Sequence, residues 1–276
     1  PECTQSNPSA ASELYKRQVL PLLPNRPMAP GGGFNPWEVW FLTVLMASIS
    51  FAGYVAVRVL GGTRGLLVSS LAGAVVSSTA VTMTLARSAA SAANPLPLAG
   101  AASLAAMVSI LRVCTVVLAI EPSVLATVGM PALTASVVFA LCGILLLTNH
   151  GQDPEKGTPA RNPFELGPLL LFAMLFAIVS TASAALAAQF GGHGLLASSA
   201  LAGMFDVDVS VLSALRLVEH SVSVEAVGLA VLTALAANAI GRLSLAVFAG
   251  PVRFWLPLAG ITLVAAAAGY FTMLLL

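Results

Sequence analysis

Hydrophobic and polar positions along the chain form long blocks. Apolar runs long enough to cross a bilayer cover residues 36–60, 65–87, about 98–120 and about 123–148, and four more follow after residue 162. An uninterrupted run of about 18 or more apolar residues is typical of a transmembrane helix, whose backbone groups bond within the segment. The pattern therefore predicts an all-α fold, a polytopic transmembrane helical bundle of about eight helices.

The order of polar signals in the first half of the chain recurs in the second half. The matched stretches are 35–39 with 162–166, 61–62 with 191–192, and 65–70 with 194–199. In this register residues 77–79, Ser-Ser-Thr, fall opposite residues 206–208, Asp-Val-Asp. Allowing a shift of one residue, Arg112 falls opposite Arg242. Apolar composition alone would not reproduce these signals in one order, so the sequence indicates an internal duplication.

The duplication divides the chain into four parts. These are a Pro- and Gly-rich polar tail at 1–34, a four-helix repeat at 35–150, a polar linker at 151–161, and a second four-helix repeat at 162–276. The chain does not begin with Met, which fits a fragment or a processed form. At the start of each repeat, Asn35 and Asn162 are expected to cap a helix, with Glu38 and Glu165 reaching back to the cap.

Two topologies fit this pattern. If all four segments of each repeat span, the repeats are parallel; if each second segment dips in and returns, the repeats are inverted. With all segments spanning, the tail side holds Lys16, Arg17, Arg26, Arg87, Lys156, Arg161 and Arg216, and the other side holds Arg58, Arg64 and Arg253. With re-entrant second segments, the tail side keeps four of these charges and six face the other way. The positive-inside rule favours eight spanning helices with a cytoplasmic tail.

Composition and charge exclude several classes of protein. The chain is 58% hydrophobic and 8% charged, whereas about 25% of the residues in a soluble domain are charged. The net charge of +1 gives no field for binding nucleic acid. The three cysteines lack metal-site spacing, and no enzyme motif is present. We therefore expect neither an enzyme nor a bound cofactor.

Asp206 and Asp208 are the most informative residues of the sequence. A charged residue at the centre of a membrane helix costs roughly 2.5–3.5 kcal/mol and is usually functional. On an ideal helix the two carboxylates would point about 200° apart, but unwinding near Gly203 would bring them to one side. They could then bind a metal ion or a proton. In the alternative interpretation, each Asp pairs with one of the two intramembrane arginines, Arg112 and Arg242.

Other polar residues of the apolar runs could line a transport pathway with these two. They are Ser77, Ser78, Thr79, Arg112, Asn238 and Arg242. Hydroxyl and amide side chains are equally suited to hydrogen bonds between packed helices. The arginines could bind an anion or hold the carboxylates, or simply extend toward the membrane surface. Both interpretations stay open for each residue.

The chain resembles a known family of bacterial membrane proteins. The resembling residues are 20–24, Leu-Pro-Leu-Leu-Pro; 35–40, Asn-Pro-Trp-Glu-Val-Trp; 50–55, Ser-Phe-Ala-Gly-Tyr-Val; 73–82, around Ser-Ser-Thr; 206–208; and 237–238. They are similar to the C-terminal part of MgtC/SapB-type proteins, catalogued as domain of unknown function 4010. The resemblance implies a multi-pass protein of the bacterial inner membrane. It links the chain to magnesium homeostasis only through the different, N-terminal domain of MgtC relatives.

These observations lead to two functional hypotheses. The first is a transporter or channel-like permease for a small cation, a divalent metal such as Mg²⁺ or H⁺, with its site between the repeats. Asp206 and Asp208 would bind the cation, and the neutral ligands would be Ser77, Ser78, Thr79 and Asn238. The second is a non-transporting scaffold or regulatory subunit that packs against a partner, which could be a second copy or an MgtC-like N-terminal domain. An aqueous cavity reaching Asp206 would favour the first hypothesis.

Overall fold

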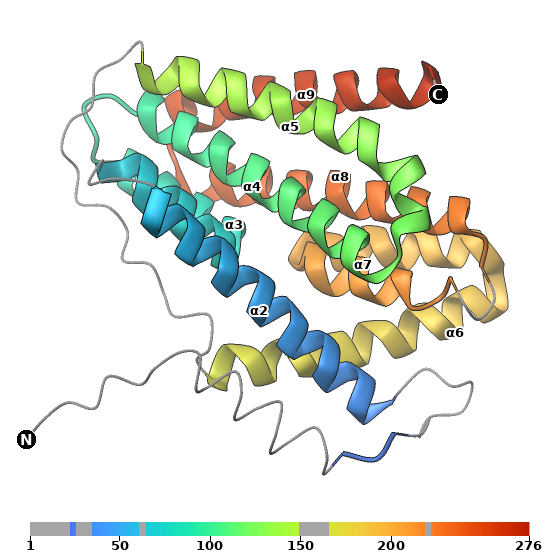
Figure 1. The fold of residues 1–276 in the computed structure, drawn as a ribbon. Coiled ribbons are helices and arrows are strands. Elements are labelled where there is room, and N and C mark those ends of the chain that lie inside the picture. Colours follow the sequence, from blue (N-terminus) through green and yellow to red (C-terminus); the bar gives the residue numbers. More distant parts are fainter. Residues whose placement is uncertain (1–22, 26–34, 61–64, 149–165, 219–221, 276) are drawn as a thin grey trace, which may run out of the picture.

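The computed structural model describes residues 23–25, 35–60, 65–148, 166–218 and 222–275, and within these ranges the fold is helical (Figure 1). The α-helices are α2 (Pro36–Leu60), α3 (Gly65–Ala89), α4 (Leu96–Ile120), α5 (Leu125–Thr148), α6 (Leu166–Phe205), α7 (Val207–Leu215), α8 (Val224–Ala249) and α9 (Val252–Leu275). A short 3₁₀ helix, η3 (Pro122–Val124), joins α4 to α5. The predicted all-α bundle of about eight helices is confirmed. The linker 151–161 and nearly all of the tail 1–34 lie outside the described residues.

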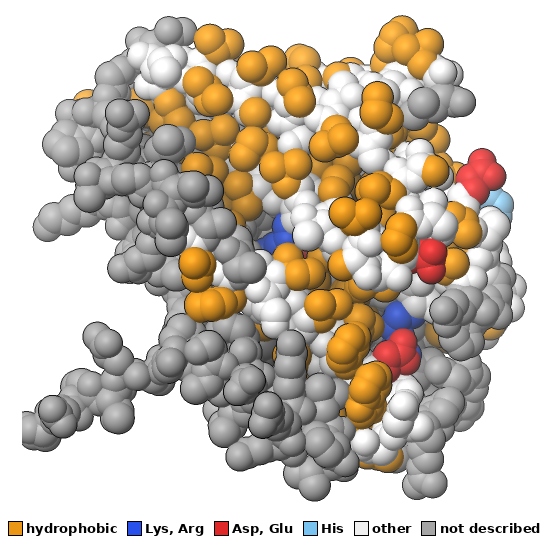
Figure 2. Space-filling model, in the orientation of Figure 1, with side chains coloured by type: hydrophobic (Ala, Val, Ile, Leu, Met, Phe, Trp, Pro, Cys, Tyr) orange, Lys and Arg blue, Asp and Glu red, His pale blue; other side chains and the backbone are white. Residues whose placement is uncertain are grey.

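The bundle has the surface of a multi-pass membrane protein. Five helical stretches of the described residues are long and apolar enough to cross a bilayer: Leu96–Ile120, Pro122–Thr148, Leu170–Phe205, Val224–Ala249 and Val252–Leu275. Large apolar side chains on these helices point outward, and Phe248 is 89% exposed. Figure 2 shows one face covered mainly by hydrophobic side chains. Lipid solvates such an apolar surface, whereas exposing it to water would be energetically unfavourable.

Helix α3 does not cross the bundle as one straight rod. Ser77 has extended backbone angles (φ −158°, ψ 102°) that interrupt the helix. A Cβ atom added to Gly73 would lie 2.8 Å from Cγ2 of Val81. Residues eight apart on one straight helix are separated by about 12 Å along its axis. The chain therefore turns back at Ser77, and α3 forms a helical hairpin, called hairpin 1.

The second repeat contains the same device. At Gly191 (φ 58°, ψ −139°) α6 reverses, so it consists of a first arm, 166–190, and a second arm, 192–205. A positive φ is easily adopted only by glycine. The chain breaks again at Asp206 (φ −149°, ψ 112°), after which α7 runs back along the second arm. The hydroxyl of Ser210 donates to the carbonyl of Ser199 at 3.1 Å, which an unbroken helix would not allow. The second arm and α7 form hairpin 2.

Connectivity then fixes the arrangement of the two halves. Hairpin 1 begins and ends at the side where α2 ends, and α4 and α5 cross the bundle once each. The first arm of α6 crosses again, so hairpin 2 begins and ends at the opposite side, as the ribbon shows (Figure 1). The sequence-based expectation that all eight segments span is therefore wrong. Each second segment folds back, and the two halves are inverted relative to each other.

The two halves differ in their last helices. Helix α5 packs along α4, whereas α9 packs chiefly against α5 and to a smaller, similar extent against α4 and α8. Close backbone approach tightens the α4–α5 pair, since a Cβ on Gly100 would lie 2.7 Å from the Gly143 carbonyl oxygen. The core helices α4 and α8 thereby hold both hairpins in the middle of the bundle.

A cavity between the tips of the two hairpins

The tips of hairpins 1 and 2 meet at a cavity. The volume of this cavity is about 270 Å³. Its lining comes from both tips and from the middle of α4 and α8: Val76, Ser77, Ser78, Thr79, Ala80, Met83, Arg112, Phe205, Asp206, Val207, Asp208 and Asn238. The cavity thus brings together all but one of the side chains that the sequence singled out. The exception, Arg242, lines a separate small cavity.

Asp206 shapes the tip of hairpin 2. Its Oδ1 atom accepts hydrogen bonds from the backbone N–H groups of Asp208 at 2.9 Å and Val209 at 3.2 Å. The carboxylate therefore caps the first turn of α7, where free N–H groups and the helix dipole favour a negative charge. The predicted unwinding is present, but it falls on Asp206 itself. Gly203 instead lets the second arm approach α8, since its Cβ would meet the Ala234 carbonyl oxygen at 2.7 Å.

Ser77 has the same place in hairpin 1. Its hydroxyl oxygen accepts from the backbone N–H of Ala80 at 3.2 Å and so caps the returning arm. Ser77 and Asp206 are the positions that the internal duplication places opposite each other, and both have extended backbone angles. Two helix N-termini therefore point into one cavity, one capped by a neutral hydroxyl and the other by a carboxylate.

Arg112, from the middle of α4, connects the two tips. One guanidinium nitrogen, Nη1, donates to the carbonyl of Val75 at 2.6 Å and to that of Val76 at 3.4 Å. These carbonyls end the first arm of hairpin 1. The other nitrogen, Nη2, donates to Oδ2 of Asp208 in hairpin 2. Both charged residues are buried, and Arg112 thus pairs with an acid of the other half while holding a helix end of its own half.

Three polar atoms of residues that line this cavity lack a partner in the described part of the chain. They are Oδ1 of Asp208, a hydrogen-bond acceptor, and two donors, Nδ2 of Asn238 and Nε of Arg112. All three residues are buried and line the cavity. A buried polar group without a partner costs about 1–3 kcal/mol. The residues around the cavity therefore have one acceptor and two donors without a partner.

The two acids that the sequence predicted as metal ligands are engaged in other contacts. Among the described residues no group of three or more His, Cys, Asp or Glu could hold an ion. Of the predicted pair, Asp206 is engaged as a helix cap and Asp208 faces a guanidinium. The sequence left open whether each acid pairs with an arginine. Asp208 does pair with one, whereas Asp206 accepts hydrogen bonds from backbone amides.

One ion pair outside the cavity was missed by sequence reasoning. Glu38 was expected to reach back to its helix cap, but its two carboxylate oxygens accept from Nε and Nη2 of Arg216, each at 2.7 Å. Arg216 also donates to the hydroxyl of Ser180 at 2.6 Å. Asn35 does cap α2, accepting from the N–H of Trp37 at 3.2 Å. The pair joins residues 178 apart in sequence, and only the duplication, which sets Arg216 opposite Arg87, marked this arginine out.

Comparison with known proteins identifies the family. A family model described as "Domain of unknown function (DUF4010)" matches residues 44–250. The match includes both hairpins, Arg112 and Arg242, and it carries no link to MgtC/SapB proteins. No curated protein and no solved structure matches the chain. Because the matched region covers most of its length, the chain belongs to the DUF4010 family.

Proposed function

We propose that this protein is a membrane transporter or channel-like permease whose pathway passes through the cavity between the hairpin tips. The observation that carries the proposal is the pair of opposed broken helices, whose tips meet at the Arg112–Asp208 ion pair. Inverted halves with broken helices at mid-membrane depth are typical of transporters, whose substrate and ion sites lie there. Irregular backbone at this depth is tolerated where it lines a cavity.

Among small cations, the geometry favours H⁺ over a divalent metal. Mg²⁺ needs close to octahedral oxygen coordination, and the Arg112 guanidinium beside Asp208 repels any metal ion placed there. A proton needs only one acceptor, and Oδ1 of Asp208 is buried without a partner among the residues that the structure describes. A magnesium role of the kind that the MgtC/SapB resemblance implies would need acidic ligands beyond this pair.

Because of the ion pair, protonation of Asp208 changes how firmly the two hairpin tips are held together. When Asp208 is charged, Arg112 holds the tip of hairpin 2 to the carbonyl end of the first arm of hairpin 1. When Asp208 takes up a proton, the Coulomb attraction between the two side chains is lost. The tips can then separate, and access to the cavity changes from one side to the other. Asp206 keeps α7 capped throughout.

Charge distribution suggests an orientation for the protein in a bacterial inner membrane. On the described helices, Arg58, Arg87 and Arg253 lie on the side where α2 ends, and Arg216 lies on the side where α2 begins. The positive-inside rule then places the side where α2 ends in the cytoplasm, which reverses the orientation expected for eight spanning helices.

Proton flux into proteoliposomes tests the proposal. The purified protein is reconstituted with a pH-sensitive dye inside, and a potential drives H⁺ inward. We expect flux in the parent and at least about a tenfold loss in Asp208→Asn, which keeps the side-chain shape but cannot ionise. Glu225→Gln removes an exposed carboxylate outside the cavity and serves as the matched control. Asp206→Asn retains a good helix cap, so it separates charge from capping.

The scaffold hypothesis predicts a different outcome. If the parent passes neither H⁺ nor any of a panel of metal ions, the bundle is better explained as a non-transporting subunit that binds a partner protein or a second copy. If flux occurs but is equal in the parent and in Asp208→Asn, the ion pair has no part in transport.

A further inference from the structure

Within the described part of the chain, Arg242 is a buried cation without a counter-charge. It lies in the middle of α8 and is 5% exposed. Its Nε and Nη1 atoms have no hydrogen-bond partner among the described residues, and no acid of that part of the chain forms an ion pair with it. An arginine stays protonated at physiological pH. Burying such a charge without compensation is strongly unfavourable.

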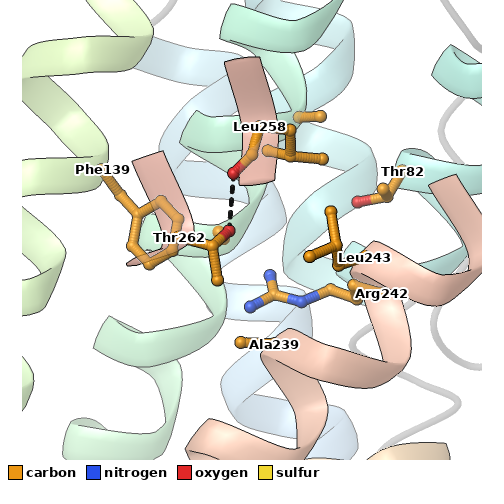
Figure 3. A pocket seen from close by; sticks show the side chains of 9 residues that line it. Thr82, Phe139, Ala239, Arg242, Leu243, Leu258 and Thr262 are labelled. Atoms are coloured by element: carbon orange, nitrogen blue, oxygen red, sulfur yellow. Dashed lines mark hydrogen bonds between the residues drawn. The ribbon is translucent and has the colours of Figure 1, made fainter. Parts of the chain in front are cut away.

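The guanidinium points into a small cavity of its own. Figure 3 shows it extending from α8 toward Thr262, with Thr82 on the other side. The volume of this cavity is about 10 Å³. That is roughly the room that one small particle such as a water molecule needs. The rest of the lining is apolar and includes Phe139 and Leu258.

The duplication explains why the counter-charge is missing. Arg112, the partner of Arg242 in the repeat, is neutralised by Asp208 of the other half. The position opposite Asp208 in the first half is Thr79, which has no charge. Arg242 thus kept the cation of the duplicated pair, whereas the first half of the molecule, which would supply its partner, has no acid at that position.

We infer that the Arg242 cavity binds a single small monovalent anion of halide size, such as chloride. An anion supplies both the acceptor that Nε and Nη1 lack and the charge that the surrounding residues do not provide. The hydroxyls of Thr82 and Thr262 now donate to the carbonyls of Ser78 at 2.8 Å and Leu258 at 2.7 Å. The hydroxyl of Thr262, toward which the guanidinium extends (Figure 3), can rotate to donate to the anion instead. The small volume favours a single small ion over phosphate or an organic acid. The site is separate from the proposed proton pathway, since Asp208 lines a different cavity, but Arg112 of that pathway is close enough to Arg242 for the two cations to repel each other.

Bromide provides a direct test in the parent protein. Crystals grown or soaked in bromide should give an anomalous difference peak within hydrogen-bond distance of the Arg242 guanidinium. Density without anomalous signal would identify a water molecule and overturn the inference, as would an empty cavity. This measurement needs no variant, so it stays decisive even if Arg242 is required for folding.

Thermal unfolding in detergent tests the same site in solution. At constant ionic strength, replacing gluconate by chloride should raise the Tm of the parent in a saturable way, because a ligand that binds only the native state stabilises it. Arg242→Gln should lose this response. Arg87→Gln, which removes an exposed cation at the end of α3, should keep it. An equal chloride response in Arg242→Gln and the parent would contradict the inference.

Discussion

Removing Arg112 is the sharpest test of how the hairpin tips are held together. The side chain pairs with Asp208 and donates to the carbonyls of Val75 at 2.6 Å and Val76 at 3.4 Å. Breaking a buried ion pair by deleting one partner costs about 3–5 kcal/mol, much of it from the charge left unpaired. We therefore expect Arg112→Gln to lower the free energy of unfolding by about 4 kcal/mol.

A double-mutant cycle isolates the ion pair from the carbonyl bonds. In Asp208→Asn, Arg112 keeps its bonds to hairpin 1, and the loss should be smaller, about 2–3 kcal/mol. In the double variant no unpaired charge remains, so the two losses should not add, and the coupling should be on the order of 2 kcal/mol. Reversible unfolding in mixed micelles with increasing SDS, followed by circular dichroism, measures all four proteins.

The refuting result is additivity. If the losses add within about 0.5 kcal/mol, the two side chains do not interact, and the link between the hairpin tips is wrong. Arg87→Gln combined with Glu225→Gln serves as the control cycle. Both residues are exposed and on different helices, so their effects should be small and additive.

Three further predictions concern single positions. In Gly194→Ala the new Cβ would lie 2.1 Å from the Leu186 carbonyl oxygen. Separating the two arms of α6 to make room for it should lower the free energy of unfolding by about 1–3 kcal/mol. Gly260→Ala, whose new Cβ would have nothing within 4 Å, should be neutral in the same SDS titration. Glu38→Gln breaks a partly exposed pair, so it should cost at most about 1 kcal/mol, and a larger loss would show that the pair is shielded from water. Asp206→Ala removes the cap of α7 and should cost about 1 kcal/mol more than Asp206→Asn; equal Tm values would contradict a capping role.

Much of the fold follows from local signals in the sequence. In the first repeat the apolar runs predicted helix bounds close to those observed, and Asn35 caps the helix it was expected to cap. The register of the duplication placed Ser77 opposite Asp206, and both turn out to break a helix. These features depend on residues near one another in the chain, so composition and spacing were sufficient to find them.

The reversal of each second segment could not be predicted in the same way. The run 65–87 is long enough to span, and neither proline nor glycine stands at Ser77. What turns the chain is tertiary: Arg112 satisfies the carbonyls at the end of the incoming arm, and the cavity allows the irregular backbone. The partners of Arg112 and Arg242 could not be predicted either, because ion pairs between distant segments leave no local pattern in the sequence.

The opposed hairpins are the central claim, and cysteine accessibility tests them most directly. Single cysteines at Ser91, in the turn after hairpin 1, and at Glu225, in the first turn of α8, are introduced into a variant without native cysteines. The protein is then labelled in sealed, oriented vesicles with a membrane-impermeant maleimide. The inverted arrangement predicts that the two cysteines react from opposite sides of the membrane. If both react from the same side, the second segments span, and the account is wrong.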